Sequence, residues 1–107
     1  MPDSVKTIKH HAFAVCTALK SLNISNSVEK IDDGAFSYCT ALESVTIPDS
    51  VKSIGYCAFA GTALKSVNIP NSVTTIDEKA FVECTSLESV TAVKLDNSAT
   101  AESIVKV

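Results

Sequence analysis

The chain has 107 residues and a formal net charge of −3, and 46% of its residues are hydrophobic. This size and composition fit one globular domain without a disordered tract. The negative charge argues against a nucleic-acid or anionic-membrane partner, since both require clustered Lys and Arg. No stretch approaches the ~18 consecutive apolar residues of a membrane span. The first residues show no signal peptide, so a cytoplasmic location is expected, with the cell surface as the alternative if the chain is a trimmed fragment.

A regular set of phenylalanines divides the chain into repeats. Each follows an alanine, and they recur at steps of 23, 23 and 22 residues: Phe13, Phe36, Phe59 and Phe81. They define four coils, numbered 1 to 4 below, which cover residues 2–24, 25–47, 48–69 and 70–92. Residues 93–107 fit a C-terminal cap or a degenerate repeat. Because such a period is typical of one small unit stacked on its copies, we predict a single domain over residues 1–107.

The elements of each coil follow the same order, as coil 1 shows. Asp3-Ser4 forms a turn, because these side chains satisfy backbone groups locally. The spacing from Phe13 to Leu19 leaves room for about one 3₁₀-like helical turn. Apolar and polar residues then alternate at the end of residues 19–24, which predicts a strand with one buried face. Stacked coils would pair these strands in parallel at ~4.8 Å per step.

Coil 3 is one residue shorter than the others. In the other coils a cysteine precedes a threonine at one repeat position: Cys16, Cys39 and Cys84. We predict that coil 3 lacks this residue. The three cysteines should form a packed column, since a buried thiol behaves as a small hydrophobic group. A Cys16–Cys39 disulfide is the alternative, whereas zinc would need C-x-x-C or C-x-x-H pairs, which do not occur.

Two longer motifs carry a family resemblance. Residues 39–47 (Cys-Thr-Ala-Leu-Glu-Ser-Val-Thr-Ile) and 47–59 (Ile-Pro-Asp-Ser-Val-Lys-Ser-Ile-Gly-Tyr-Cys-Ala-Phe) resemble the BspA-type leucine-rich repeats of bacterial surface proteins and protozoan parasites. The resemblance extends over residues 2–92. It implies an α/β fold, namely a right-handed leucine-rich-repeat solenoid with a concave parallel β-sheet and short 3₁₀ or irregular convex segments. It also implies protein binding, adhesion or host interaction, with no catalytic residue to carry over.

The outward-facing strand residues form the candidate binding surface. They make three polar columns, which are Lys20, Glu43, Lys65 and Glu88, then Ser21, Ser44, Ser66 and Ser89, then Asn23, Thr46, Asn68 and Thr91. We predict that this concave face contacts a protein partner whose identity the residues do not reveal. The alternative is an exposed ladder whose charged side chains pair with one another and need no partner, because the charges of the first column alternate in sign. The columns lack the Trp, Tyr and Arg anchors of a tight hot spot.

The N-terminal end of the array is a second candidate for contacts. Val5 and Ile8 belong to the first coil, and no polar cap precedes them. Because solenoids need terminal caps to cover the last apolar layer, we expect this edge to associate with another copy and form a homo-oligomer.

Enzymatic chemistry has little basis in the sequence. There is no phosphate-binding glycine loop, G-x-S-x-G elbow or H-E-x-x-H helix, and we expect no cofactor or metal. His10 and His11 fit a solvated pair near Asp33, and Cys57 beside Lys79 is a remote redox candidate. We therefore predict a non-catalytic protein-interaction module that self-associates through its uncapped ends. A surface adhesin or host-binding fragment is the alternative, and an enzyme is the remote one.

Overall fold

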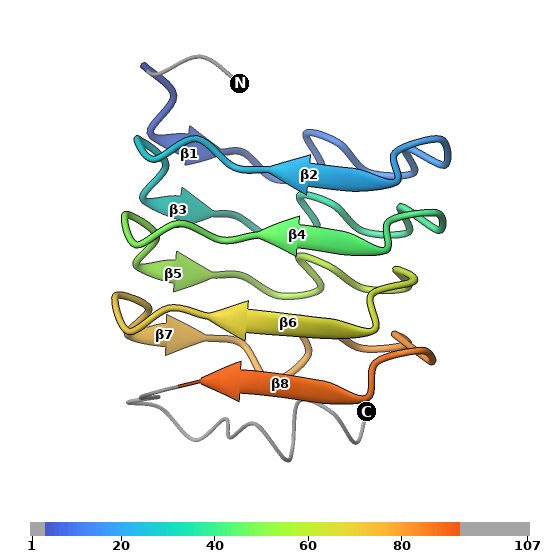
Figure 1. The fold of residues 1–107 in the computed structure, drawn as a ribbon. Coiled ribbons are helices and arrows are strands. Elements are labelled where there is room, and N and C mark those ends of the chain that lie inside the picture. The colour runs from blue at the N-terminus through green and yellow to red at the C-terminus, as the bar shows by residue number, and fades with distance from the viewer. Residues whose placement is uncertain (1–3, 93–107) are drawn as a thin grey trace.

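The computed structural model describes residues 4–92, which form a stack of four coils (Figure 1). The expected cap at residues 93–107 lies outside this described part. Each coil contributes one strand of two residues and one of three or four residues. The shorter strands are β1 (Thr7–Ile8), β3 (Lys30–Ile31), β5 (Ser53–Ile54) and β7 (Thr75–Ile76). The longer strands are β2 (Ser21–Asn23), β4 (Ser44–Thr46), β6 (Ser66–Ile69) and β8 (Ser89–Ala92).

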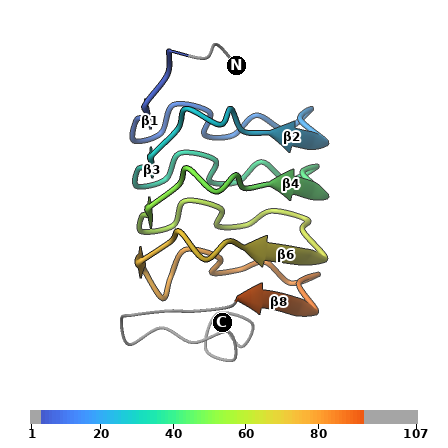
Figure 2. The ribbon, with the colours of Figure 1, turned by 60° about the vertical axis from the view of Figure 1, so that its left-hand side comes forward.

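Two parallel stacks of strands lie on different sides of the coils, as Figure 2 shows. The shorter strands form one four-stranded sheet in the order β1-β3-β5-β7. Its register follows the sequence repeat, since Ile8 lies beside Ile31, and Ile54 beside Ile76. The longer strands form the parallel pairs β2-β4 and β6-β8. This confirms the predicted parallel stacking of one repeated unit.

The phenylalanines form a single file through the core. Neighbouring rings are stacked with centroids 5.3 Å apart at all three steps. Phe36, Phe59 and Phe81 are fully buried, whereas Phe13 at the N-terminal end is 40% exposed. Columns of Val, Ile and Leu surround the rings, so each coil covers the apolar side of its neighbour. The burial of this shared core is the main source of stability, because no single coil could bury its apolar face alone.

The segments expected to be 3₁₀-like are pairs of consecutive turns instead. In coil 2, the amide of Ala35 closes a turn by donating to the carbonyl of Asp32 at 3.2 Å. The next amide, that of Phe36, donates to the carbonyl of Ala58 in coil 3 at 2.7 Å. Because alternate amides bond across coils, they are not available for a continuous helical ladder. Residues 4–92 contain no helix, so the α/β expectation is not borne out and this part of the chain is a β-solenoid.

The short coil interrupts one of the two strand stacks. β4 and β6 lie side by side, yet they are not hydrogen-bonded as neighbours in a sheet. The prediction that coil 3 lacks the cysteine position was wrong. Thr62 fills it, since its side chain is 4% exposed and its hydroxyl lies 3.2 Å from the thiol of Cys84. The missing residue belongs to the following turn, where a deletion leaves no hole in the core.

Candidate binding surfaces

All twelve residues of the predicted binding columns are exposed. They lie on the four longer strands or directly before them, and we call this surface the strand face. The register places Ser21 beside Ser44, and Asn23 beside Thr46. The same pairing recurs between β6 and β8. The structure therefore brings the predicted residues together into one polar surface, and the alternate residues of the same strands, which are buried or partly buried, pack against the core beneath it.

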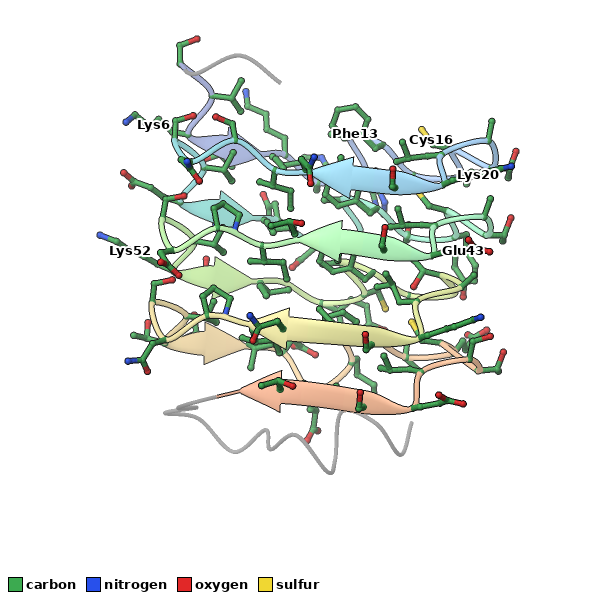
Figure 3. All side chains as sticks on the ribbon, in the orientation of Figure 1. Lys6, Phe13, Cys16, Lys20, Glu43 and Lys52 are labelled. Atoms are coloured by element: carbon green, nitrogen blue, oxygen red, sulfur yellow. The ribbon has the colours of Figure 1, made fainter. Side chains whose placement is uncertain are left out.

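The charged column runs along one edge of the strand face. Figure 3 shows Lys20 and Glu43 one above the other, at the beginning of β2 and β4. Their backbones are joined, because the amide of Glu43 donates to the carbonyl of Lys20 at 2.8 Å. Within residues 4–92, however, no ion pair connects the four charged side chains of this column. Their charged groups are therefore exposed to solvent and available to a partner.

The exposed aromatic residues lie away from the strand face, on the turns. Tyr38 is 42% exposed, and its hydroxyl donates a hydrogen bond to Oε1 of Glu83 at 3.0 Å. This hydrogen bond and the charge of Glu83 raise the pKa of Tyr38. The ring lies over Gly61, where any side chain would collide with it. The sequence analysis did not predict this contact. Gly61 was a signal of it, because this glycine occupies the repeat position that carries larger side chains in the other coils, namely Val15, Tyr38 and Glu83.

The backbone of these turns adopts the left-handed conformation at two positions in the repeat. Val15, Tyr38, Gly61 and Glu83 share one position, with φ between 57° and 67°. Glycine adopts this conformation without penalty, whereas a β-branched valine there is a genuine outlier. The strain at Val15 shows that the inter-coil hydrogen bonds, such as that from its amide to the carbonyl of Ser37 at 2.8 Å, dictate the local backbone.

A second group of polar residues surrounds Tyr56, which is 54% exposed. The carboxylate of Asp33 accepts a hydrogen bond from the amide of Tyr56 at 2.9 Å. Asp33 is thus directed to coil 3, rather than to His10 as the sequence suggested. Hydrogen bonding to Cys57 raises the pKa of the Tyr56 phenol. The redox role of Cys57 stays a prediction, and no group of metal-ligating side chains occurs among residues 4–92.

The cysteines contribute to packing. All four are free thiols, so the alternative Cys16–Cys39 disulfide is not formed. Cys39 donates to the carbonyl of Phe13 at 3.2 Å, and Cys84 donates to that of Phe59 at 3.0 Å. Burial raises the pKa of Cys39 and of Cys84, because a thiolate there would lose its hydration. Both groups are therefore poor nucleophiles, as expected of a structural column.

The N-terminal end of the stack presents an apolar hollow of about 470 Å³. Of the two edge residues predicted from the sequence, Val5 is partly buried and Ile8 is 3% exposed. The exposed apolar area comes instead from Ala12 and Phe13, whose counterparts in the other coils are buried. Figure 3 shows Phe13 at this end of the stack. The hollow is lined by Val5, Thr7, Ile8, Lys9, Ala12, Phe13, Leu22 and Asn23.

Comparisons with known proteins agree with this geometry. The family model described as BspA type leucine rich repeat region (6 copies) matches residues 1–103. Among solved structures, a leucine-rich repeat protein from Bacteroides ovatus is similar, with 43% identity, a TM-score of 0.80, and coverage of 85% of this chain and 24% of that one. A leucine rich cell surface protein from Faecalibacterium prausnitzii shows 35% identity and a TM-score of 0.73, over 88% of this chain and 30% of that one.

A third solved structure, a leucine-rich repeat protein of T. pallidum, shows 25% identity and a TM-score of 0.68, over 80% of this chain and 51% of that one. The chain thus spans between a quarter and a half of the length of these relatives. The search of curated proteins gave no significant match. No helix that could cross a membrane is found in residues 4–92.

Proposed function

Since this chain belongs to the BspA-type leucine-rich repeat family, we propose that it is a non-catalytic protein-interaction module that binds a protein partner through the strand face. The observation that carries this proposal is the arrangement of twelve exposed polar residues on one face of a folded core, in register within β2-β4 and within β6-β8. Because this core is already ordered, binding would not require the strand face to fold, which reduces the entropic cost of association.

The charged column determines the kind of partner that fits. Lys20, Glu43, Lys65 and Glu88 alternate in sign and make no ion pairs with one another in the described residues. A partner whose surface charges alternate in the opposite order would place a charge of opposite sign beside each of the four side chains. Exposed charges of this kind contribute to specificity and association rate more than to affinity. We therefore propose a modest affinity that weakens as ionic strength rises.

The test is affinity capture with matched charge variants. The variant Lys20→Glu, Glu43→Lys, Lys65→Glu, Glu88→Lys reverses the column and keeps the net charge. The control reverses Glu29 and Lys52, which are neighbours on coils 2 and 3 outside the strand face, and it also keeps the net charge. Proteins that bind the wild type and the control, but not the column variant, would support the proposal. An unchanged set of captured proteins would contradict it.

The exposed N-terminal end supports a second proposal, which is association between solenoids, with self-association as its simplest form. Phe13 is 40% exposed, whereas its counterparts Phe36, Phe59 and Phe81 are fully buried. Sedimentation of the purified chain over a wide concentration range tests this form. A strict monomer at the highest concentration, at both low and high salt, would rule out self-association and leave the strand-face proposal untouched.

The location that these comparisons favour differs from the expectation of a cytoplasmic protein. One similar protein, that of F. prausnitzii, is described as a cell surface protein. No comparison supports a cytoplasmic location. We therefore propose the cell-surface alternative, in which the strand face would act in adhesion or host binding. Surface labelling of intact cells that express the native gene would test this, and labelling only after lysis would contradict it.

A further inference from the structure

A polar hollow of about 560 Å³ lies on the side of the stack, where the chain leaves β3, β5 and β7. We call it the side hollow. It belongs to the sheet of shorter strands, which lies on a different side of the coils from the strand face (Figure 2). Because the coils of a solenoid add at its ends, further coils would not cover a hollow on its side. Its charged and aromatic lining residues are Lys30, Asp32, Asp33, Tyr56 and Asp77, with Gly55 among them.

A glycine interrupts a column of aspartates in the side hollow. Asp32, Gly55 and Asp77 occupy the same repeat position in coils 2, 3 and 4, directly after the shorter strands. The coils stay in register here, since the amide of Gly55 donates to the carbonyl of Ile31 at 2.8 Å. The two aspartates are therefore two strand spacings apart, about 10 Å. Gly55 places no side chain between them, and a side chain there would collide with the carboxylate of Asp33.

Backbone amides orient the three carboxylates of the side hollow. Oδ1 of Asp32 accepts a hydrogen bond from the amide of Asp33 at 2.8 Å. Oδ1 of Asp33 accepts one from the amide of Tyr56 at 2.9 Å. Oδ1 of Asp77 accepts one from the amide of Lys79 at 2.8 Å. Because an ionised carboxylate accepts hydrogen bonds at both oxygens, each of the three retains Oδ2 for a donor from outside the described residues.

Tyr56 supplies an exposed ring beside these carboxylates. Its side chain is 54% exposed. A hydrogen bond to Cys57 raises the pKa of Tyr56, and the negative charge of Asp77 adds to this rise, so the carboxylate of Asp77 lies near the phenol group. Tyrosine is enriched among the residues that contribute most to protein interfaces. The side hollow therefore has the aromatic anchor that the strand face lacks.

The charges of the side hollow select the class of its ligand. Three carboxylates and the ammonium group of Lys30 give its lining a formal charge of −2. Within residues 4–92, no three ligating side chains lie close enough to hold a metal ion. A guanidinium group fits this arrangement, because it offers five N–H donors in one plane and stacks on aromatic rings.

We propose that the side hollow binds an arginine side chain of a protein partner. The guanidinium group would enter the gap at Gly55 and stack on the ring of Tyr56. It would donate hydrogen bonds to the carboxylates of Asp32 and Asp77 on either side. This contact is separate from the strand face and does not depend on it. A neutral carbohydrate would also stack on Tyr56, but it would leave the negative charge of the lining unbalanced.

NMR titration of the full chain with short peptides tests this assignment. The probe is the capped peptide Gly-Ser-Arg-Ser-Gly. Its matched control carries citrulline, a neutral side chain of the same shape, in place of arginine. Methyl glucoside is titrated in parallel as a neutral carbohydrate. The readout is the dissociation constant obtained from the shifts of the Gly55 and Tyr56 amides.

Three variants locate the contact. Asp32→Asn with Asp77→Asn removes both charges and keeps the oxygens that accept the backbone amides. Glu43→Gln with Glu88→Gln is the matched control, because it changes the net charge by the same amount on the strand face. Tyr56→Ser removes the ring at a position that carries polar residues in the other coils.

The arginine peptide should bind with a millimolar dissociation constant. The double aspartate variant should weaken this binding about tenfold and Tyr56→Ser about threefold, whereas the strand-face control should leave it nearly unchanged. Equal shifts with the citrulline peptide or with methyl glucoside would overturn the choice of a cation. Equal weakening by the strand-face control would mean general charge attraction, and no shift with the arginine peptide would overturn the site. None of these outcomes bears on binding through the strand face.

Discussion

The file of phenylalanine rings makes a quantitative prediction about stability. Phe59 is fully buried and stacks on a ring at 5.3 Å on each side. Truncation of a core phenylalanine to alanine costs about 3–5 kcal/mol. Of this, the two ring contacts account for about 1–3 kcal/mol, at about 0.5–1.5 kcal/mol for each pair. Phe59→Ala should therefore remove a large part of the ~5–15 kcal/mol that stabilises a domain.

Phe13→Ala is the matched comparison. Phe13 occupies the same repeat position, but it is 40% exposed and has one stacked neighbour. Because it buries less area and makes half the ring contacts, its truncation should cost about half as much, roughly 1.5–2.5 kcal/mol. Phe59→Leu, which keeps most of the buried volume, serves as a milder variant if Phe59→Ala does not fold.

Urea unfolding followed by circular dichroism would measure these differences from the midpoint and the m value. The m value should stay constant, because the same surface is exposed on unfolding. Equal losses for Phe13→Ala and Phe59→Ala would refute the reasoning, since they would mean that the two rings are equally buried. A loss below about 1 kcal/mol for Phe59→Ala would show that the ring file is not the core.

Two further predictions concern the turns. Because Glu83 raises the pKa of Tyr38 above its ordinary value of 10.0, the stability that this group contributes is fully present below about pH 10 and is lost as pH rises through the raised pKa. Urea unfolding at pH 9 and pH 11 should show a smaller decline for Glu83→Gln than for the wild type, and an equal decline would contradict the assignment. Insertion of one threonine after Thr62 should restore the pairing of β4 with β6. Hydrogen exchange at the Lys65 amide should then slow, and unchanged exchange would show that the shortened turn does not cause the break.

Much of the strand face could be predicted because its exposed side chains occupy the same positions in every repeat. In coil 1 the polar residues Ser21 and Asn23 alternate with the apolar residues Leu22 and Ile24, and because this pattern recurs about every 23 residues it indicates which side chains point outward in all coils. All twelve predicted residues are indeed exposed. The period also identified the N-terminal end, but it did not distinguish Ile8, which is buried, from Phe13, which supplies the exposed area. That distinction depends on how deeply each side chain lies in the last layer.

The amino-acid sequence by itself determined the number of coils, their parallel order and the single file of rings, because a repeated apolar pattern can be buried only by stacking its copies in register. Only the tertiary structure decided how the turns satisfy their backbone. Alternate amides such as that of Phe36 bond to the next coil, which excludes the expected 3₁₀ segments. The tertiary structure likewise placed Thr62 in the cysteine column and joined Tyr38 to Glu83 across 45 residues. These contacts depend on which atoms meet between coils, and the spacing of residues within one coil does not contain that information.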